Sequence, residues 1–134
     1  MAKILVVEDN VTNMKLSTFL LESADHEVIA AANAETGLTL ARDRHPDLIL
    51  MDIQLPGMDG LEATALLKAD VATRRIPVIA LTALAMKGDK ERILAAGCNG
   101  YIAKPLDYKN FLMVVAAALA SPRSDGDPTF VVVP

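Results

Sequence analysis

The chain has 134 residues, 52% of them hydrophobic, and a formal net charge of -4. This length and composition suit one folded domain with a substantial core rather than a disordered segment. The acidic balance argues against a nucleic-acid partner, and no apolar run approaches the ~20 residues that cross a membrane.

The chain begins with an expected strand followed by an expected helix. Residues 4–7 form a continuous apolar run, which is typical of a buried strand, and Glu8 and Asp9 follow it directly. Asn10 is suited to cap the next helix. The apolar positions of that helix, which recur near helical spacing, are Met14, Leu16, Phe19, Leu20 and Leu21.

A weaker strand and a second helix come next. We expect His26 in an exposed loop and residues 28–32 in a strand at a sheet edge. Asn33 caps a helix through residue 44, and His45-Pro46 ends it because a residue before proline disfavours helix.

The third strand is the most distinctive stretch of the sequence. Residues 48–51 are apolar without polar alternation, which fits a strand buried on both faces, and Asp52 ends the run. Pro56 and Gly57 then force a loop, and residues 60–69 form a helix with Leu61, Leu66 and Leu67 as its apolar residues.

The last part of the chain repeats the pattern twice. Strands are expected at 78–81, ending at Thr82, and at 101–103, ending at Lys104-Pro105. Between them a short helix covers 89–96 with Ile93 and Leu94 inward, and Gly97 is its C-cap. Asp107 caps the final helix, whose apolar side is Phe111, Leu112, Val115 and Leu119.

Five strand-helix units in about 120 residues predict an α/β fold, a parallel sheet with helices on both faces. We expect the domain to span 1–120. Residues 121–134 form a polar linker and a β-prone end, which we expect to be a flexible tail; pairing with a sheet edge or a neighbouring chain is the alternative.

The lone cysteine and the two histidines limit which disulfides and metal sites the chain can form. Cys98 allows no internal disulfide and is expected to be a small core residue, and without an export signal it suits a cytoplasmic protein. One cysteine with His26 and His45 provides no zinc site of the usual kind, whereas carboxylates remain available for a hard cation.

Polar residues follow four of the predicted strands: Glu8 and Asp9, Asp52, Thr82, and Lys104. The carboxyl ends of parallel strands share one edge, so we expect these side chains to meet there. Three carboxylates in one crevice repel unless cations compensate, which predicts a role for Lys104 and for Mg2+. An ionised Asp52 is then a candidate nucleophile toward phosphorus, with Thr82 and Lys104 on the phosphoryl oxygens.

Four stretches, KILVVEDN, PDLILMDIQLPGMDGLE, IPVIALTA and GYIAKP, resemble the receiver domain of two-component response regulators. Together with the segment after IPVIALTA, they are similar to DivK-type single-domain response regulators. The resemblance covers residues 3 to about 119. It implies a flavodoxin-like (CheY-like), doubly wound five-stranded parallel sheet of order 2-1-3-4-5 with five helices.

The resemblance also implies residue roles. Asp52 would be the phosphorylated aspartate, and Thr82 and Lys104 would contact the phosphoryl group. Glu8, Asp9 and Asp52 would bind Mg2+, together with the backbone carbonyl of Gln54. Lys104-Pro105 would be a cis peptide. Tyr101 would be an aromatic switch that follows Thr82, and plain edge-strand packing is the alternative for Tyr101.

The implied function is a phosphoacceptor of a two-component phosphorelay, not an enzyme in the usual sense. A sensor histidine kinase or a histidine phosphotransfer protein would donate the phosphoryl group. A downstream protein would read the face built from the fourth helix, the fifth strand and the fifth helix, a region whose Gly88, Gly97 and Gly100 indicate low local stability.

Two alternatives remain. A Mg2+-dependent phosphatase with an aspartyl nucleophile would need an acid two residues after Asp52, where this chain has Gln54. A receiver that binds partners constitutively, without phosphorylation, is disfavoured by the intact Asp52, Thr82 and Lys104.

Overall fold

The computed structural model describes residues 2–83 and 87–120. Within these residues the chain forms five strands, β1 (Lys3–Val7), β2 (Glu27–Ala31), β3 (Leu48–Asp52), β4 (Val78–Thr82) and β5 (Gly100–Ala103). They alternate with five helices, α1 (Val11–Ser23), α2 (Ala34–Arg44), α3 (Gly60–Ala69), α4 (Lys87–Ala95) and α5 (Tyr108–Ala120). The expected boundary at residue 120 and both hypotheses for the tail at 121–134 concern residues outside the described ranges, so they stay predictions.

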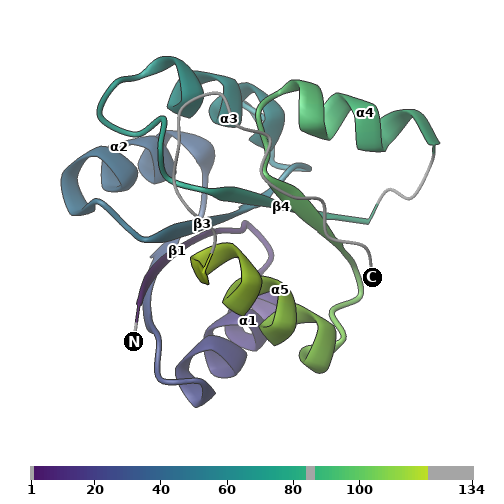
Figure 1. Cartoon of the computed structure of the whole chain (residues 1–134). Helices are drawn as coiled ribbons and strands as arrows, with labels where there is room; N and C mark the ends of the chain where they lie inside the picture. The colour runs from purple at the N-terminus through teal and green to yellow at the C-terminus, as the bar shows by residue number, and fades with distance from the viewer. Residues whose placement is uncertain (1, 84–86, 121–134) are drawn as a thin grey trace.

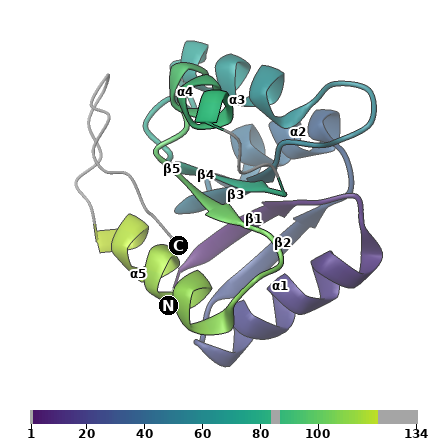
Figure 2. The same cartoon turned by 90° about the vertical axis from the view of Figure 1, so that its right-hand side faces the viewer.

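The sheet is parallel throughout and has the order β2-β1-β3-β4-β5. Helices α2, α3 and α4 cover one face, and α1 and α5 cover the other (Figures 1 and 2). The predicted fold class is therefore confirmed, including the strand order and the edge position of β2.

Two apolar layers explain why the central strands show no polar alternation. Successive residues of a strand point to opposite faces, so Ile49 and Met51 join the layer under α2–α4 while Leu48 and Leu50 join the layer over α1 and α5. Because helices cover both faces, every residue of β3 is buried.

Helix ends follow the predicted capping residues. The side chains of Asn10 and Asn33 accept the backbone N–H of the third residue beyond them, and Asp107 accepts that of Lys109. His45 ends α2 in the left-handed conformation, with φ 47°, and Gly97 follows α4 with φ 107°.

Some boundaries and facings differ from expectation. Strands β1 and β2 begin one residue early because Lys3 pairs with Glu27 in the ladder and its N–H donates to Asp47 Oδ2 at 2.8 Å. Helix α4 begins at Lys87, before Gly88, and ends at Ala95. The side chains of Leu16, Phe19 and Leu66 are 39%, 68% and 50% exposed, because each helix turns only one stripe toward the sheet.

None of the helices in the described ranges is both long and apolar enough to cross a bilayer.

Candidate functional site

The carboxyl ends of β1, β3, β4 and β5 bring the predicted residues to one edge of the sheet. Glu8 and Asp9 directly follow β1, Asp52 and Thr82 are the last residues of their strands, and Lys104 directly follows β5. The register aligns Val7 with Met51, Asp52 with Leu81, and Thr82 with Ala103, so the strands end nearly level. The predicted convergence is therefore present.

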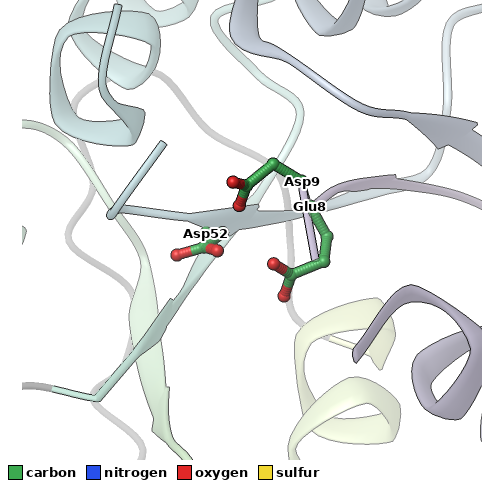
Figure 3. Close-up of side chains that lie close together, drawn as sticks. All are labelled: Glu8, Asp9 and Asp52. Atoms are coloured by element: carbon green, nitrogen blue, oxygen red, sulfur yellow. The ribbon is translucent and has the colours of Figure 1, made fainter. Parts of the chain in front are cut away.

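Three carboxylates form the centre of this edge. One oxygen each from Glu8, Asp9 and Asp52 lies within 4.8 Å of the others (Figure 3). Glu8 and Asp52 are each only 2% exposed, whereas Asp9 is exposed. The cluster is thus buried on one side and open to solvent on the other.

Lys104 supplies the positive charge of the site. Its ammonium lies 3.1 Å from Glu8 Oε1 and 3.1 Å from Asp52 Oδ2. The backbone N–H of Lys104 donates to the carbonyl of Thr82 at 2.8 Å, which ties the start of the following loop to β4. The Lys104-Pro105 peptide is cis, as the resemblance implies.

Backbone amides orient the two buried acids. The N–H of Gln54 donates to Asp52 Oδ1 at 2.9 Å, which leaves Asp52 Oδ2 beside Lys104. The N–H of Asn10 donates to Glu8 Oε2 at 3.2 Å. Sequence reasoning missed both contacts, because an amide donor carries no residue-type signal.

The electrostatics show an excess of negative charge. Burial, a hydrogen bond with Asp52 and the charge of Asp52 together raise the pKa of Glu8 to about 7, against the opposing effects of Lys104 and of the Asn10 N–H. Burial lowers the pKa of Lys104, but Asp52 and Glu8 outweigh burial and raise it above the usual value. One ammonium does not fully compensate three carboxylates.

The donor set fits a hard divalent cation. Glu8 Oε1 is buried and accepts no hydrogen bond, and its close contact with positive charge is the ion pair with the Lys104 ammonium at 3.1 Å. A buried carboxylate oxygen that accepts no hydrogen bond, beside two further carboxylates, is a set of oxygen ligands that Mg2+ can use while keeping water on its open side.

The other predicted residues differ in their exposure to solvent. Thr82 is 1% exposed. Gln54 is an exposed residue of the loop after β3, and its carbonyl as a metal ligand stays a prediction. Tyr101 is partly buried and packs against the layer under α2–α4, as the packing alternative expects, and its switch role stays a prediction.

The histidines and the cysteine lie elsewhere. His26, expected to be exposed, is partly buried, and its Nδ1 accepts the N–H of Ala2 at 3.3 Å. His45 caps α2. Cys98 is buried, and burial raises the pKa of its thiol to about 11, so the expectation of a core residue is confirmed.

Comparison with known proteins agrees with the geometry. The family model described as response regulator receiver domain matches residues 4–116. The polar-differentiation response regulator DivK of Brucella ovis (strain ATCC 25840 / 63/290 / NCTC 10512) is 51% identical over 116 residues, which are 87% of this chain and 94% of that protein. DivK of Brucella melitensis biotype 1 gives the same values.

Solved structures show the same fold. The receiver domain of sensor histidine kinase PA1611 from Pseudomonas aeruginosa PAO1, crystallised with a magnesium ion coordinated in its active-site cleft, matches with TM-score 0.84 and 38% identity, covering 90% of this chain and 98% of that one. The chemotaxis protein CheY4 of Vibrio cholerae matches with TM-score 0.84 and 26% identity, covering 88% and 98%.

Proposed function

This chain belongs to the response regulator receiver domain family, and on that premise we propose that it accepts a phosphoryl group on Asp52. The donor would be a phosphohistidine of a sensor histidine kinase or a histidine phosphotransfer protein. The observation that carries the proposal is the orientation of Asp52, whose Oδ1 accepts the Gln54 N–H at 2.9 Å while Oδ2 lies 3.1 Å from the Lys104 ammonium.

The transfer uses residues already at the edge. An Asp52 carboxylate oxygen forms a bond to phosphorus, and the bond between phosphorus and the donor imidazole nitrogen breaks, with its electron pair returning to that nitrogen. Lys104 pairs with one phosphoryl oxygen, and the Thr82 hydroxyl donates to another. Such a reaction requires mainly positioning and charge neutralisation.

Glu8, Asp9, Asp52 and the backbone carbonyl of Gln54 would hold Mg2+ at this edge. The bound ion would offset the negative charge of the incoming phosphoryl oxygens. The mutual proximity of the three carboxylates supports this assignment, as does the buried Glu8 Oε1, which accepts no hydrogen bond.

A downstream protein would recognise the phosphorylated state at a surface away from Asp52. Phosphorylation adds roughly -1.5 to -2 charge and new acceptor oxygens. Convergence of Thr82 and Lys104 on these oxygens would bias β4, β5 and the α4 segment between them, with Tyr101 as the candidate switch side chain. We propose that a downstream protein binds the face built from α4, β5 and α5. Of these elements, α5 exposes Tyr108 and Met113.

The test is intact-mass measurement after incubation with Mg2+ and a small phosphodonor such as phosphoramidate. Wild type should gain the mass of one phosphoryl group, and Asp52→Asn should gain none. Asp43→Asn, at an exposed position on α2, is the matched control and should behave as wild type. Equal phosphorylation of Asp52→Asn and wild type would contradict the proposal.

The same samples separate a phosphoacceptor from the alternative phosphatase. A receiver assists its own phosphorylation and dephosphorylation without turning over free esters. Sustained hydrolysis of p-nitrophenyl phosphate that Asp52→Asn abolishes would favour the phosphatase, although Gln54 offers no acid to protonate a leaving group.

A further inference from the structure

The loop that follows Asp52 returns to the backbone of Asp52. Gly60, the first residue of α3, is buried, and its N–H donates to the carbonyl of Ile53 at 3.3 Å. The start of α3 therefore packs directly on the end of β3. Gly60 is not in the left-handed region, so backbone conformation alone does not require glycine there.

Close approach is what requires glycine at position 60. A Cβ atom there would lie 2.7 Å from Ile53 Cα and 2.9 Å from the carbonyl carbon of Asp52, and closer still to the carbonyl oxygen of Asp52. All three are main-chain atoms, which cannot rotate away as the end of a side chain can. A methyl group at position 60 must therefore displace α3 or the Asp52-Ile53 peptide.

Helix α3 is fixed from its own side. Asp59 Oδ1 accepts the N–H of Glu62 at 2.9 Å, and the Thr64 hydroxyl, buried in the core, donates to the Gly60 carbonyl at 2.8 Å. Ala63 and Leu67 are buried in the layer beneath the helix. Movement of α3 away from the sheet would open this packing. Part of the displacement that a methyl group at position 60 forces is therefore taken up by the end of β3.

The Asp52-Ile53 peptide, at the end of β3, determines the orientation of the acceptor carboxylate. The N–H of Ile53 donates to the Leu81 carbonyl at 3.2 Å, and the next N–H, that of Gln54, donates to Asp52 Oδ1. Movement of this peptide changes both contacts together. It also changes the distances from Asp52 to Lys104 and Glu8.

We propose that Gly60 is a positioning residue for phosphoryl transfer. The absence of a side chain at position 60 lets α3 press on the Asp52-Ile53 peptide, which fixes the acceptor carboxylate against Lys104 and the carboxylate cluster. The inference rests on the proposed function, and it assigns Gly60 no contact with the phosphoryl group.

Gly37→Ala is the matched control for Gly60→Ala. Gly37 is also a buried helical glycine, on α2, but a Cβ there meets a side-chain methyl, Val7 Cγ2, at 2.8 Å. Gly37→Ala thus crowds a side chain of the layer under α2–α4, whereas Gly60→Ala crowds the backbone of Asp52 and Ile53. Each protein is first shown to be folded by circular dichroism.

The rate of Asp52 phosphorylation is then measured against phosphoramidate concentration at saturating Mg2+. Because a displacement of about 1 Å can cost about a hundredfold in rate, Gly60→Ala should lower the maximal rate by about tenfold or more, with Gly37→Ala within about twofold of wild type. A Gly60→Ala rate within twofold of wild type, or equal losses in both variants, overturns the inference.

A second readout does not depend on phosphorylation. The amide resonance of Gln54 reports its hydrogen bond to Asp52 and should shift in Gly60→Ala but not in Gly37→Ala; an unchanged resonance overturns the inference. If wild type takes up no phosphoryl group, the proposed function fails, and the Gln54 resonance still decides whether Gly60 positions Asp52.

Should Gly60→Ala alone not fold, both measurements are made in a Gly88→Ala background. A Cβ at position 88 meets nothing within 4 Å, and alanine favours helix over glycine. Gly88→Ala by itself is then the reference, and the same two criteria apply.

Discussion

At the scale of single residues, the buried carboxylates at the edge of the sheet depend on the Lys104 ammonium for charge compensation. Lys104 lies between Glu8 and Asp52, which are both buried, and its side chain is only 15% exposed. Removing one partner of a buried ion pair leaves the remaining charge uncompensated, and this costs more than the pair contributes while intact. Lys104 therefore has a structural role in addition to the proposed role toward phosphate.

Lys104→Met should destabilise the metal-free protein by about 2 kcal/mol, below the usual cost of breaking a buried pair because Glu8 can take up a proton. Mg2+ should then raise the melting temperature of Lys104→Met more than that of wild type. Thermal unfolding with EDTA and with Mg2+ measures both effects.

Lys109→Met, at an exposed position on α5, is the control and should match wild type under both conditions. Equal stability of the two variants in EDTA would show that the ammonium of Lys104 contributes no net stabilisation to the carboxylates.

The residues that sequence could identify are those whose side chains face the shared edge. Glu8, Asp9, Asp52, Thr82 and Lys104 each follow or end an apolar run, and the carboxyl ends of parallel strands lie at one edge of a sheet. The amides of Asn10 and Gln54 and the bare Cα of Gly60 act through backbone proximity. Such proximity depends on how the loop after β3 folds back, which residue type does not encode.

At the scale of elements, a partly buried lysine joins α3 to the segments at the amino ends of β4 and β5. The ammonium of Lys68 donates to the carbonyls of Arg74 and Ile76 at 3.2 and 2.7 Å and to Asn99 Oδ1 at 3.2 Å. The Asn99 side chain also accepts the N–H of Val78 at 2.9 Å. Lys68 thus links α3 with the segments that lead into β4 and β5.

This lysine predicts a pH dependence of stability. Burial lowers the pKa of Lys68 to about 8 from its ordinary value of 10.5. Between those values the unfolded chain binds more protons than the folded one, so the contribution of Lys68 to the free energy of unfolding rises with pH. From pH 8 to pH 10 the free energy of unfolding of wild type should therefore rise relative to that of Lys68→Met.

Urea titrations followed by circular dichroism at several pH values measure the difference between the two proteins. Lys90→Met, at an exposed position on α4, is the control and should show a constant difference from wild type. A constant difference for Lys68→Met as well would contradict a lowered pKa in the folded state.

The helices and strands themselves could be predicted from hydrophobic periodicity and capping residues. Which side chains face the core could not be predicted for every residue. Phe19 and Leu66 match helical spacing but face solvent, because α1 buries Ser17, Leu20 and Leu21 and α3 buries Ala63, Thr64 and Leu67. Small residues such as Ser17, Ala63 and Thr64 are buried where the helices pack on the sheet. Because these residues are only weakly hydrophobic, a pattern of large apolar residues does not identify them.

At the scale of the whole molecule, the site and the proposed output face share β4 and β5. Thr82 ends β4, Lys104 follows β5, and α4 lies between the two strands in sequence. Strand β2 forms the opposite edge of the sheet. A change at Thr82 and Lys104 should therefore reach α4 and β5 and leave β2 unaffected.

Amide hydrogen exchange with and without beryllofluoride, a phosphoryl mimic, tests this expectation. Protection should change within residues 87–105 and stay constant over β2 (Glu27–Ala31). Asp52→Asn should show no change in either region. Unaltered exchange over 87–105 in wild type that binds beryllofluoride would count against the proposed output face.

Strand order is the part of the architecture that pattern alone did not specify. Alternating strands and helices require a parallel sheet with both faces covered, but several strand orders would bury the same apolar runs. The order 2-1-3-4-5 was available only through resemblance to the receiver family. Burial sets which residues are inside, and loop geometry sets which strands are neighbours.

The burial of Cys98 also makes the protein convenient for spectroscopy. It is the one thiol in the sequence, and its high pKa keeps it protonated and unreactive near neutral pH. A maleimide dye would therefore attach selectively to a cysteine introduced on the surface, such as Met113→Cys on α5, without mutation of the native one. Because Met113 is exposed on α5, that dye would report the docking of a partner on this helix.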